Sequence, residues 1–383
     1  MKSRPVTTFI ILLLVALIGA EGAFARKAKK KSSRKKRPAI SVVYTSPDGN
    51  EWIHKGKKGI YIVKDSLGQV RAMQDFTGTA AAGRRYSEII SEYALLLAHD
   101  SIRVYSLVAP TQGEFYLPQP VSTQGAEKAT IQTMYGYLDP KVTPVMVCDT
   151  LRAHVNEEIY NRTDHHWSPL GAYYAAKVFA EKAGVFFRPL SDYTIGEVKD
   201  YVGTMYKFSG DAAVKNSPET FVYYMPPTGY RAEFITYTVS GGKTVGESEP
   251  EVRNFFRHFD DGAGAAYSTF MGGDSFTVKV SETGGTPGRK LLIVKDSYGN
   301  AMAPMLFGSF EEVHVADFRY FPHGLIEYVR TNGITDLLFI NTIQLAIAPN
   351  TADRLKIMLG KETDELDIDD PDSEEDESDE DEQ

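Results

Sequence analysis

The chain has 383 residues, of which 42% are hydrophobic, and its formal net charge is −9. This charge is uneven: residues 1–37 carry +10 and residues 362–383 carry −15, which leaves −4 for the residues between them. A mildly acidic central region excludes a nucleic-acid-binding domain, and its length is sufficient for an ordinary hydrophobic core. The single Cys148 excludes an intrachain disulfide, and its apolar surroundings, the predicted strand 142–148, suggest a small core residue.

The N-terminus has the order of a secretory signal peptide. Lys2 and Arg4 precede the apolar run 9–20, and the Ala-Phe-Ala at 23–25 offers a cleavage site. Nine basic residues within 26–37 resist translocation, so an uncleaved membrane anchor is the alternative. We predict a signal peptide over residues 1–25 and an exported, periplasmic or otherwise extracytoplasmic protein.

Two charged segments flank the predicted domain at 40–361. Residues 26–39 form a basic arm that we expect to be disordered and to contact a membrane surface or an anionic wall polymer. Residues 362–383 hold fifteen acidic side chains, too polar for a core, and we expect a disordered tail.

From residue 59 onward, strands alternate with helices. The pattern predicts strands at 59–63, 101–110 and 142–148, and helices at 84–99, 127–138, 151–160 and 168–184. The last helix carries signals at both ends, with Ser168 as its cap, Pro169 in its first turn and Gly184 at its close. Such alternation predicts an α/β fold with a mainly parallel sheet.

This alternation of strands and helices stops between residues 195 and 288, where short strands and turns predict a β-rich insertion within the same domain. The α/β pattern then resumes. It predicts strands at 290–295, 311–317 and 334–341, and helices at 297–308 and 323–333. Because ligands bind beyond the carboxyl ends of parallel strands, residues directly after these strands are the candidates for a site.

Ser297 stands at such a position, in a turn between an apolar strand and a small-residue helix. A hydroxyl and free backbone N–H groups in one turn meet the needs of acyl transfer, a nucleophile and an oxyanion site. The alternative is that Ser297 only caps the helix. Ser275, in a Gly-Asp-Ser sequence, is a weaker candidate because it leads into a strand.

A serine nucleophile needs a base, and the base needs an orienting group. In "TDHHW", Asp164 and His166 are two residues apart, so in an extended loop they project to the same side, and Asp164 can fix the tautomer of His166. His165 would then point away and be structural, and Trp167 would form a wall beside the His166 ring.

The segments 162–175, 291–301, 316–321 and 333–341 together resemble the DHHW protein family, which is related to the SGNH-like domains of alginate O-acetyltransferases. The resemblance covers nearly all of residues 40–350. It implies a flavodoxin-like (SGNH hydrolase-like) three-layer sandwich and places Asp164, His166 and Ser297 on the family's triad. Relatives take an acyl group from a membrane-bound O-acyltransferase and transfer it to sugar hydroxyls.

Further residues are candidates for the oxyanion and substrate sites. Asn341 ends a strand and could supply the side-chain amide of an oxyanion hole, and the backbone of Gly272 and Gly273 could add amides. Lys-Asp precedes the serine in place of the Gly-Asp of many SGNH enzymes. Arg319 and Tyr320 also follow a strand, and they either bind a glycan or pack in the core.

Three other functions stay open. A metal site could use the Asp-His-His triplet with His154, Asp149 and Asp296, but adjacent imidazoles on an extended chain diverge, so we predict no metal and no cofactor. The same triad could act as a carbohydrate esterase, or the protein could bind glycan without catalysis. We predict an exported serine-dependent acyltransferase that O-acetylates a cell-envelope or secreted polysaccharide, with a membrane-bound O-acyltransferase as acyl donor.

Overall fold

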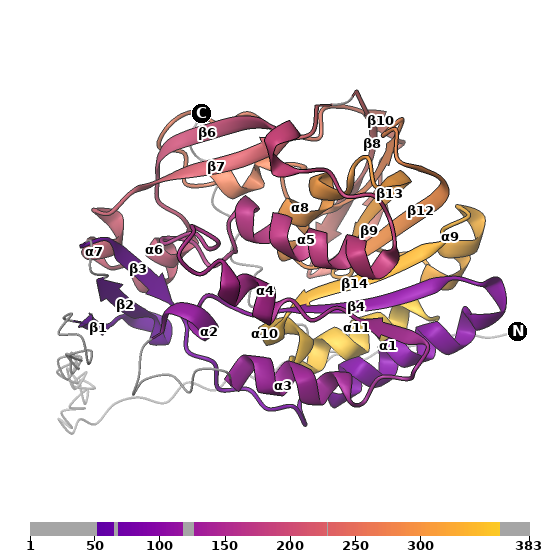
Figure 1. Ribbon diagram of the computed structural model, residues 1–383, viewed down its shortest axis with the longest axis horizontal. Coiled ribbons are helices and arrows are strands. Elements are labelled where there is room, and N and C mark those ends of the chain that lie inside the picture. The colour runs from indigo at the N-terminus through magenta and orange to yellow at the C-terminus, as the bar shows by residue number, and fades with distance from the viewer. Residues whose placement is uncertain (1–51, 65–67, 118–125, 228, 361–383) are drawn as a thin grey trace, which may run out of the picture. The chain divides into compact units, whose positions relative to one another are not determined.

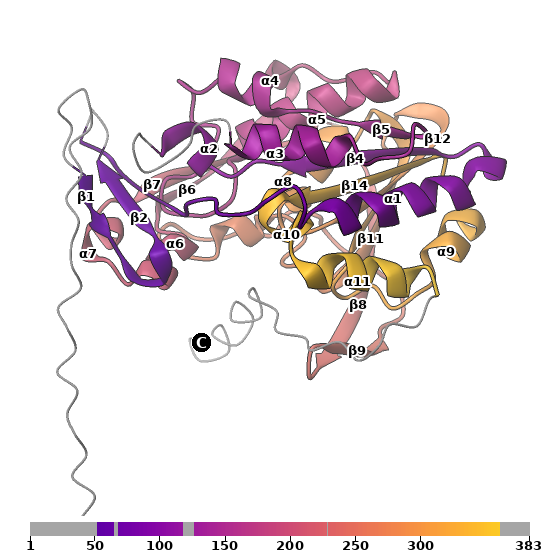
Figure 2. The ribbon, with the colours of Figure 1, turned by 90° about the horizontal axis from the view of Figure 1, so that it is seen from below.

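A mixed sheet of nine strands forms the centre of the fold (Figures 1 and 2). The computed structural model describes residues 52–64, 68–117, 126–227 and 229–360. Within these residues the strand order is β10-β8-β11-β13-β12-β14-β4-β5, with β9 paired to β8. Strands β1 to β3 form a separate antiparallel sheet, and β6 pairs with β7. The predicted signal peptide, basic arm and acidic tail lie outside the described residues.

The strands of the central sheet are β4 (Arg103–Ala109), β5 (Val142–Pro144), β8 (Arg231–Ser240), β9 (Lys243–Glu247), β10 (Glu251–Val252), β11 (Phe276–Ser281), β12 (Thr286–Lys295), β13 (Phe310–Asp317) and β14 (Asp336–Thr342). The other strands are β1 (Trp52–Lys55), β2 (Tyr61–Lys64), β3 (Val70–Met73), β6 (Thr194–Tyr201) and β7 (Glu219–Met225). The helices are α1 (Arg84–Leu96), α2 (Gly113–Tyr116), α3 (Ala126–Tyr135), α4 (Cys148–Ala153), α5 (Pro169–Ala183), α6 (Thr204–Ser209), α7 (Ala212–Lys215), α8 (Tyr298–Met302), α9 (Leu325–Thr331), α10 (Ile343–Ala346) and α11 (Pro349–Met358).

The strands β13, β12, β14, β4 and β5 run parallel. Helices cover both faces of this part of the sheet: α5 and α8 pack in one core cluster, and α1, α9 and α11 pack in the other. Figure 2 shows α5 and α11 on opposite sides of β14. Coverage on both faces explains why every residue of β14 is buried and apolar residues run through it without alternation. The prediction of an α/β fold with a mainly parallel central sheet is confirmed.

Helix α5 follows the local signals of its sequence. The Ser168 hydroxyl accepts a hydrogen bond from the backbone N–H of Gly171 at 3.2 Å, and Pro169 occupies the first turn. Gly184 ends the helix with a φ of +66°, in the left-handed region that favours glycine. This helix matters for the site because the Asp164–Trp167 loop enters it directly.

The segment 195–288 is more closely integrated with the sheet than its composition suggests. Its strands β8, β10 and β11 extend the central sheet in antiparallel fashion, beginning with β11 beside β13. The segment also contains two short helices, α6 and α7, which the sequence pattern does not predict. It therefore supplies both sheet and, through α6, one wall of the pocket described below.

Cys148 corrects a prediction. The sequence places it in a strand over 142–148, but β5 ends at Pro144 and Cys148 opens helix α4. Its side chain is buried, and burial raises the pKa of the thiol. A core role for Cys148 agrees with both observations.

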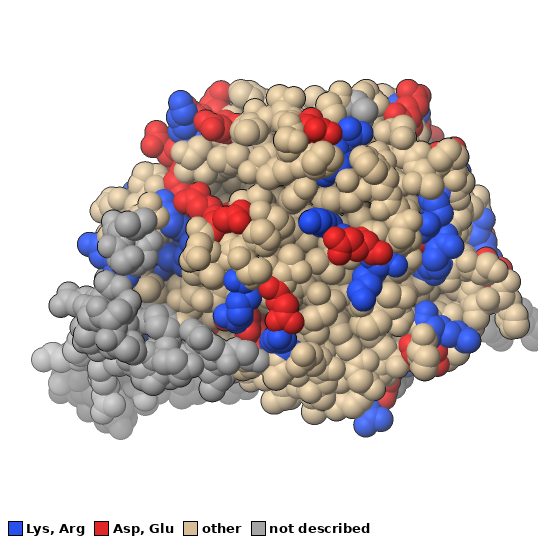
Figure 3. Space-filling view, in the orientation of Figure 1, with Lys and Arg blue, Asp and Glu red and all other residues tan. Residues whose placement is uncertain are grey.

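On the face shown in Figure 3, Lys and Arg side chains are interspersed with Asp and Glu over the described residues. None of the helices in the described part of the chain has the length and hydropathy needed to cross a bilayer.

Candidate active site

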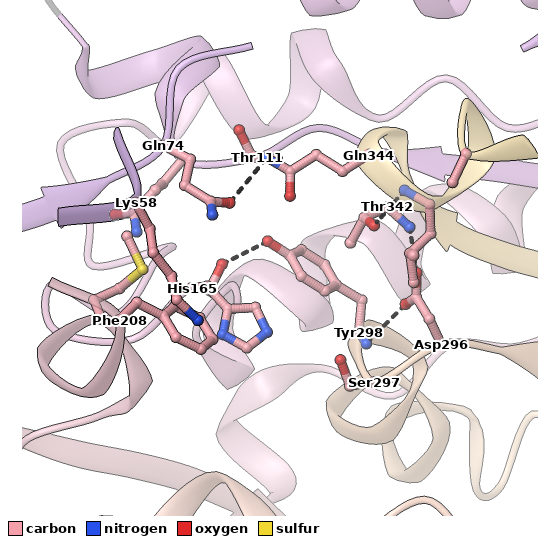
Figure 4. A pocket seen from close by; sticks show the side chains of 14 residues that line it. Lys58, Gln74, Thr111, His165, Phe208, Asp296, Ser297, Tyr298, Thr342 and Gln344 are labelled. Atoms are coloured by element: carbon pink, nitrogen blue, oxygen red, sulfur yellow. Dashed lines mark hydrogen bonds between the residues drawn. The ribbon is translucent and has the colours of Figure 1, made fainter. Parts of the chain in front are cut away.

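A pocket of about 270 Å³ lies where β4, β12 and β14 end at the carboxyl edge of the sheet (Figure 4). These three strands are neighbours, and the residues that follow each of them meet at this edge. The lining residues are Lys58, Gln74, Thr111, Gln112, His165, Met205, Phe208, Asp296, Ser297, Tyr298, Thr342, Gln344, Leu345 and Ala348. Ser297 is thus the one serine among them.

A chain of two hydrogen bonds links Ser297, His166 and Asp164. His166 Nε2 lies 2.7 Å from Ser297 Oγ, and His166 Nδ1 lies 2.6 Å from Asp164 Oδ1. Asp164 and His166 are buried, whereas Ser297 reaches the pocket. This is the arrangement in which an imidazole can take the proton of a serine hydroxyl while a carboxylate holds its other nitrogen.

Asp164 is fixed on both oxygens. Oδ1 also accepts the backbone N–H of His166 at 2.9 Å, and Oδ2 accepts the N–H and the hydroxyl of Thr204 at 3.0 and 2.9 Å. Burial alone would raise the pKa of Asp164, but the charge and hydrogen bond of His166 outweigh it, and the pKa lies well below its usual range. Asp164 is therefore an ionised acceptor at neutral pH.

The ring of His166 is stacked on Tyr267, with ring centroids 3.7 Å apart and an interplanar angle of 5°. The Tyr267 hydroxyl donates to the carbonyl oxygen of Ser297 at 3.0 Å, so one side chain contacts both His166 and Ser297. Burial, reinforced by the charge of His165, lowers the pKa of His166 to about 4, although Asp164 acts in the opposite direction. His166 is then neutral at pH 7, as a general base requires.

His165 does not point away, which corrects the prediction. Its ring centroid lies 3.7 Å from that of His166, it lines the pocket, and its Nδ1 is 2.7 Å from the hydroxyl of Thr204. The chain bends through residues 162–166 rather than running extended, so the alternation of an extended strand does not apply. Both imidazoles therefore belong to the site.

The geometry allows a test of the metal alternative. One ligand atom from each of Asp164, His165 and His166 lies within 4.8 Å of the others. However, both oxygens of Asp164 each accept two hydrogen bonds, and both ring nitrogens of His166 are engaged. A metal ion would have to displace this network, so the donor set fits the triad better than a cation.

Two of the other proposed ligands of that metal site, Asp149 and His154, lie elsewhere, whereas Asp296 lines the pocket. Asp149 is exposed and paired with Lys128, and the ring of His154 stacks on Tyr174 while its Nδ1 contacts Glu157. Neither residue lines the pocket.

Asp296 ties the serine turn to the end of β14. Oδ1 accepts the N–H of Tyr298 at 3.0 Å and Oδ2 accepts the N–H of Thr342 at 2.6 Å. Burial raises the pKa of Asp296 to about 6, although these two hydrogen bonds act to lower it. Among the described residues, the backbone N–H of Ser297 itself has no hydrogen-bond acceptor. An N–H without an acceptor beside Ser297 Oγ is a candidate donor to the oxyanion that would form on the carbonyl oxygen of a substrate attacked by this hydroxyl.

Asn341 does not reach the pocket. Its side chain lies in the core, where its Oδ1 accepts the hydroxyl of Tyr86 in α1 at 2.8 Å. Trp167 is buried too, and its Nε1 donates to the carbonyl of Tyr298 at 3.0 Å. It thus supports the serine turn from behind, and the wall beside His166 is Tyr267.

Of the two roles predicted for Arg319, glycan binding or packing in the core, its contacts agree with packing. Its guanidinium pairs with Asp317 and Asp274, the same two carboxylates that hold Lys295, and its side chain is only 4% exposed. Tyr320 is partly buried against the core, and its carbonyl accepts the Thr244 hydroxyl at 2.6 Å. Neither side chain is part of the pocket lining.

Gly272 and Gly273 have φ values of +87° and +144° and lead into Asp274. They lie outside the pocket lining, as does Ser275, whose carbonyl accepts the N–H of Tyr237. Their contribution of amides to an oxyanion site stays a prediction. Asp274 links their turn to the serine helix through Asn300, whose Nδ2 donates to it at 2.7 Å.

The fold and the site together define an α/β protein that carries a hydrogen-bonded Ser-His-Asp arrangement at the carboxyl edge of its parallel strands. The model of the DHHW protein family matches residues 55–316, and the chain belongs to that family. A DHHW family protein from Eubacterium siraeum is 38% identical, with 78% of this chain and 95% of that chain covered and a TM-score of 0.69.

Two more distant structures are similar to this chain, and one of them shares its fold. Bacillus cereus PatB1, solved with a sulfonyl adduct, is 17% identical and covers 77% of this chain and 99% of its own, with a TM-score of 0.59. The O-acetyltransferase domain of Pseudomonas putida AlgJ is 12% identical over 77% of this chain and 98% of its own, and its TM-score of 0.43 is too low to establish a common fold. No curated protein matches the chain.

Proposed function

We propose that this protein is an SGNH-like serine acyltransferase that O-acetylates a polysaccharide outside the cytoplasm. The observation that carries the proposal is the pair of hydrogen bonds that joins Asp164 to His166 and His166 to Ser297, the last of which lines the pocket. Ser297 is the catalytic nucleophile, His166 the general base and Asp164 its orienting group. The acyl donor is a membrane-bound O-acyltransferase, and the basic arm at 26–39 contacts the membrane surface.

The reaction has two steps. Ser297 Oγ attacks the carbonyl carbon of the donor while its proton moves to His166 Nε2, and the backbone N–H of Ser297 binds the resulting oxyanion. The bond to the leaving group then breaks, the leaving group takes the proton from His166, and an acyl-serine remains. In the second step a sugar hydroxyl loses its proton to His166 Nε2 as its oxygen attacks the carbonyl carbon of this ester. The bond between that carbon and Ser297 Oγ then breaks, and His166 returns the proton to Oγ, which restores the free serine and leaves the acyl group on the sugar.

An esterase is the second candidate function, because the same triad hydrolyses the acyl-serine when water enters in place of the sugar. Gln74, Thr111 and Gln344 place polar groups in the lining of the pocket, so it accommodates water as well as a sugar hydroxyl. The partition of one acyl-enzyme between water and sugar separates the two functions.

Intact mass spectrometry after incubation with an activated acetyl ester tests the proposal. We expect an added acetyl group on the wild type and on Ser275→Ala, and none on Ser297→Ala. A sulfonyl fluoride is a second probe, suggested by the sulfonyl adduct of Bacillus cereus PatB1. If no variant and no wild-type sample gains either mass, a glycan-binding role without catalysis replaces the proposal.

A further inference from the structure

The polar side chains of the pocket divide into two groups by their hydrogen-bonding state. Thr111 donates its hydroxyl to Glu127 at 2.7 Å and accepts the N–H of Gly113 at 3.3 Å. The carboxamide of Gln112 donates to the carbonyls of Ala72 and Asp164, at 2.8 and 3.1 Å, and accepts from Arg71 at 3.2 Å. These side chains are held in place by the protein and have little capacity for a ligand.

Gln74 and Gln344 differ from this first group. Gln344 Nε2 donates to Gln74 Oε1 at 3.0 Å, and within the described residues this is the hydrogen bond that either carboxamide makes. A carboxamide has two donors and an acceptor oxygen with two lone pairs, so the pair keeps both donors and acceptors for a ligand. Both side chains are half-buried, so they still meet solvent in the pocket.

The two glutamines come from distant parts of the chain. Gln74 directly follows β3 and Gln344 belongs to α10, so their contact joins the small antiparallel sheet to the edge of the central sheet. Figure 4 shows Gln74 and Gln344 on the side of the pocket opposite Ser297, and Tyr298 lies between this pair and the serine. Phe208 adds an apolar surface to the same lining.

We infer that Gln74 and Gln344 form an acceptor subsite, which binds hydroxyl groups of the sugar unit that receives the acyl group. This inference rests on the proposed function. A sugar hydroxyl is at once a donor and an acceptor, which is the combination that the two carboxamides leave open. Since they lie across the pocket from the serine, they hold the sugar at a distance from Ser297 and direct a further hydroxyl toward the acyl-serine.

The test separates the two steps of the reaction. Wild type, Gln74→Ala, Gln344→Ala and the exposed control Gln132→Ala of α3 are acylated with the activated acetyl ester. Breakdown of the acyl-enzyme is then followed by mass in water and with increasing cellopentaose or glycerol as hydroxyl-bearing probes. We expect the probe concentration for half-maximal acceleration to rise roughly tenfold in each glutamine variant, the effect of losing one hydrogen bond. The control should match the wild type.

Four results would overturn the inference. The glutamine variants could show the wild-type dependence on both probes, or acylation could fall as much as transfer, which would indicate a general structural role. A third overturning result is that neither probe accelerates breakdown of the wild-type acyl-enzyme. In that case the proposed acylation stands and the acceptor subsite does not. Absence of any wild-type acyl-enzyme would overturn the proposed function and the subsite together.

Discussion

Thr204 donates both its backbone N–H and its hydroxyl to the same oxygen of Asp164, at 3.0 and 2.9 Å, although 40 residues separate them. Thr204 is the first residue of α6 in the segment 195–288, so this segment helps to hold the Asp164 carboxylate in place. The same hydroxyl lies 2.7 Å from His165 Nδ1. Thr204 therefore contacts Asp164 and His165, and Asp164 in turn contacts His166.

Thr204→Val should lower kcat for turnover of an acetyl ester by roughly tenfold, because it removes one hydrogen bond to a buried carboxylate and preserves the shape of the side chain. KM should change little, since Thr204 does not line the pocket. Thr204→Ser keeps the hydroxyl and should retain most of the activity. Equal losses in the two variants would show that packing, and not the hydrogen bond, is what matters at this position.

Asp164→Asn should reduce kcat by about 10⁴-fold, because an amide at Oδ1 no longer fixes the tautomer in which His166 Nε2 accepts a proton. The measurement is the steady-state rate with an activated ester, and circular dichroism checks the fold. A loss of tenfold or less would mean that Asp164 acts as a structural acceptor for Thr204 and His166 and not as part of a catalytic triad.

The pH dependence should reflect the lowered pKa of His166. Only neutral His166 accepts the serine proton, so kcat/KM should increase as the pH rises through about 4 and be level at neutral pH. The charge of His165 contributes to this lowering, so His165→Ala should move the acidic limb to higher pH, whereas the exposed His99→Ala should not. An unchanged limb in His165→Ala would contradict the electrostatic coupling of the two rings.

Asp296 is a second titrating group in this profile, because its pKa is raised to about 6 and it lines the pocket. Asp296→Asn distinguishes the two groups. A step near pH 6 that disappears in this variant belongs to Asp296, and the limb near pH 4 that persists belongs to His166.

The aromatic ring of Tyr267, which holds the His166 ring in position, should contribute more to activity than the Tyr267 hydroxyl does. Tyr267→Phe keeps the stacked ring and loses one hydrogen bond to the Ser297 carbonyl, so we expect a loss in kcat of roughly tenfold. Tyr267→Ala removes the ring beside His166 as well and should cost substantially more. If the phenylalanine variant were as impaired as the alanine variant, the hydrogen bond would be the main contribution.

Lys295→Met should destabilise the fold by about 3–5 kcal/mol, because it leaves Asp274 and Asp317 with Arg319 as their remaining cation in a buried cluster. Lys290→Met, in the same strand, removes a partly exposed pair with Glu312 and should cost less than about 1 kcal/mol. Urea unfolding measures both free energies. Similar costs would show that the cluster is not a major source of stability.

Several features followed from local sequence alone. The alternation of strands and helices, the capped helix α5 and the strand-turn-helix around Ser297 depend on neighbouring residues, and the structure contains each of them. Asp164 and His166 are paired as expected, but they meet through a bend in the chain and not through the alternation of an extended loop. Local signals failed for Cys148 and His165, where a strand ended early and a loop bent, because hydrophobic pattern does not fix such details.

The sequence by itself determined the class of fold, the serine turn and the Asp-His pair, because each depends on residues that lie a few positions apart in the chain. Only the tertiary structure decided that His166 meets Ser297 across 131 positions, that Thr204 and Tyr267 complete their surroundings, and that Asn341 turns into the core. The physical reason is that these contacts depend on which strands become neighbours and on which face each side chain leaves, and both follow from burial of the whole core.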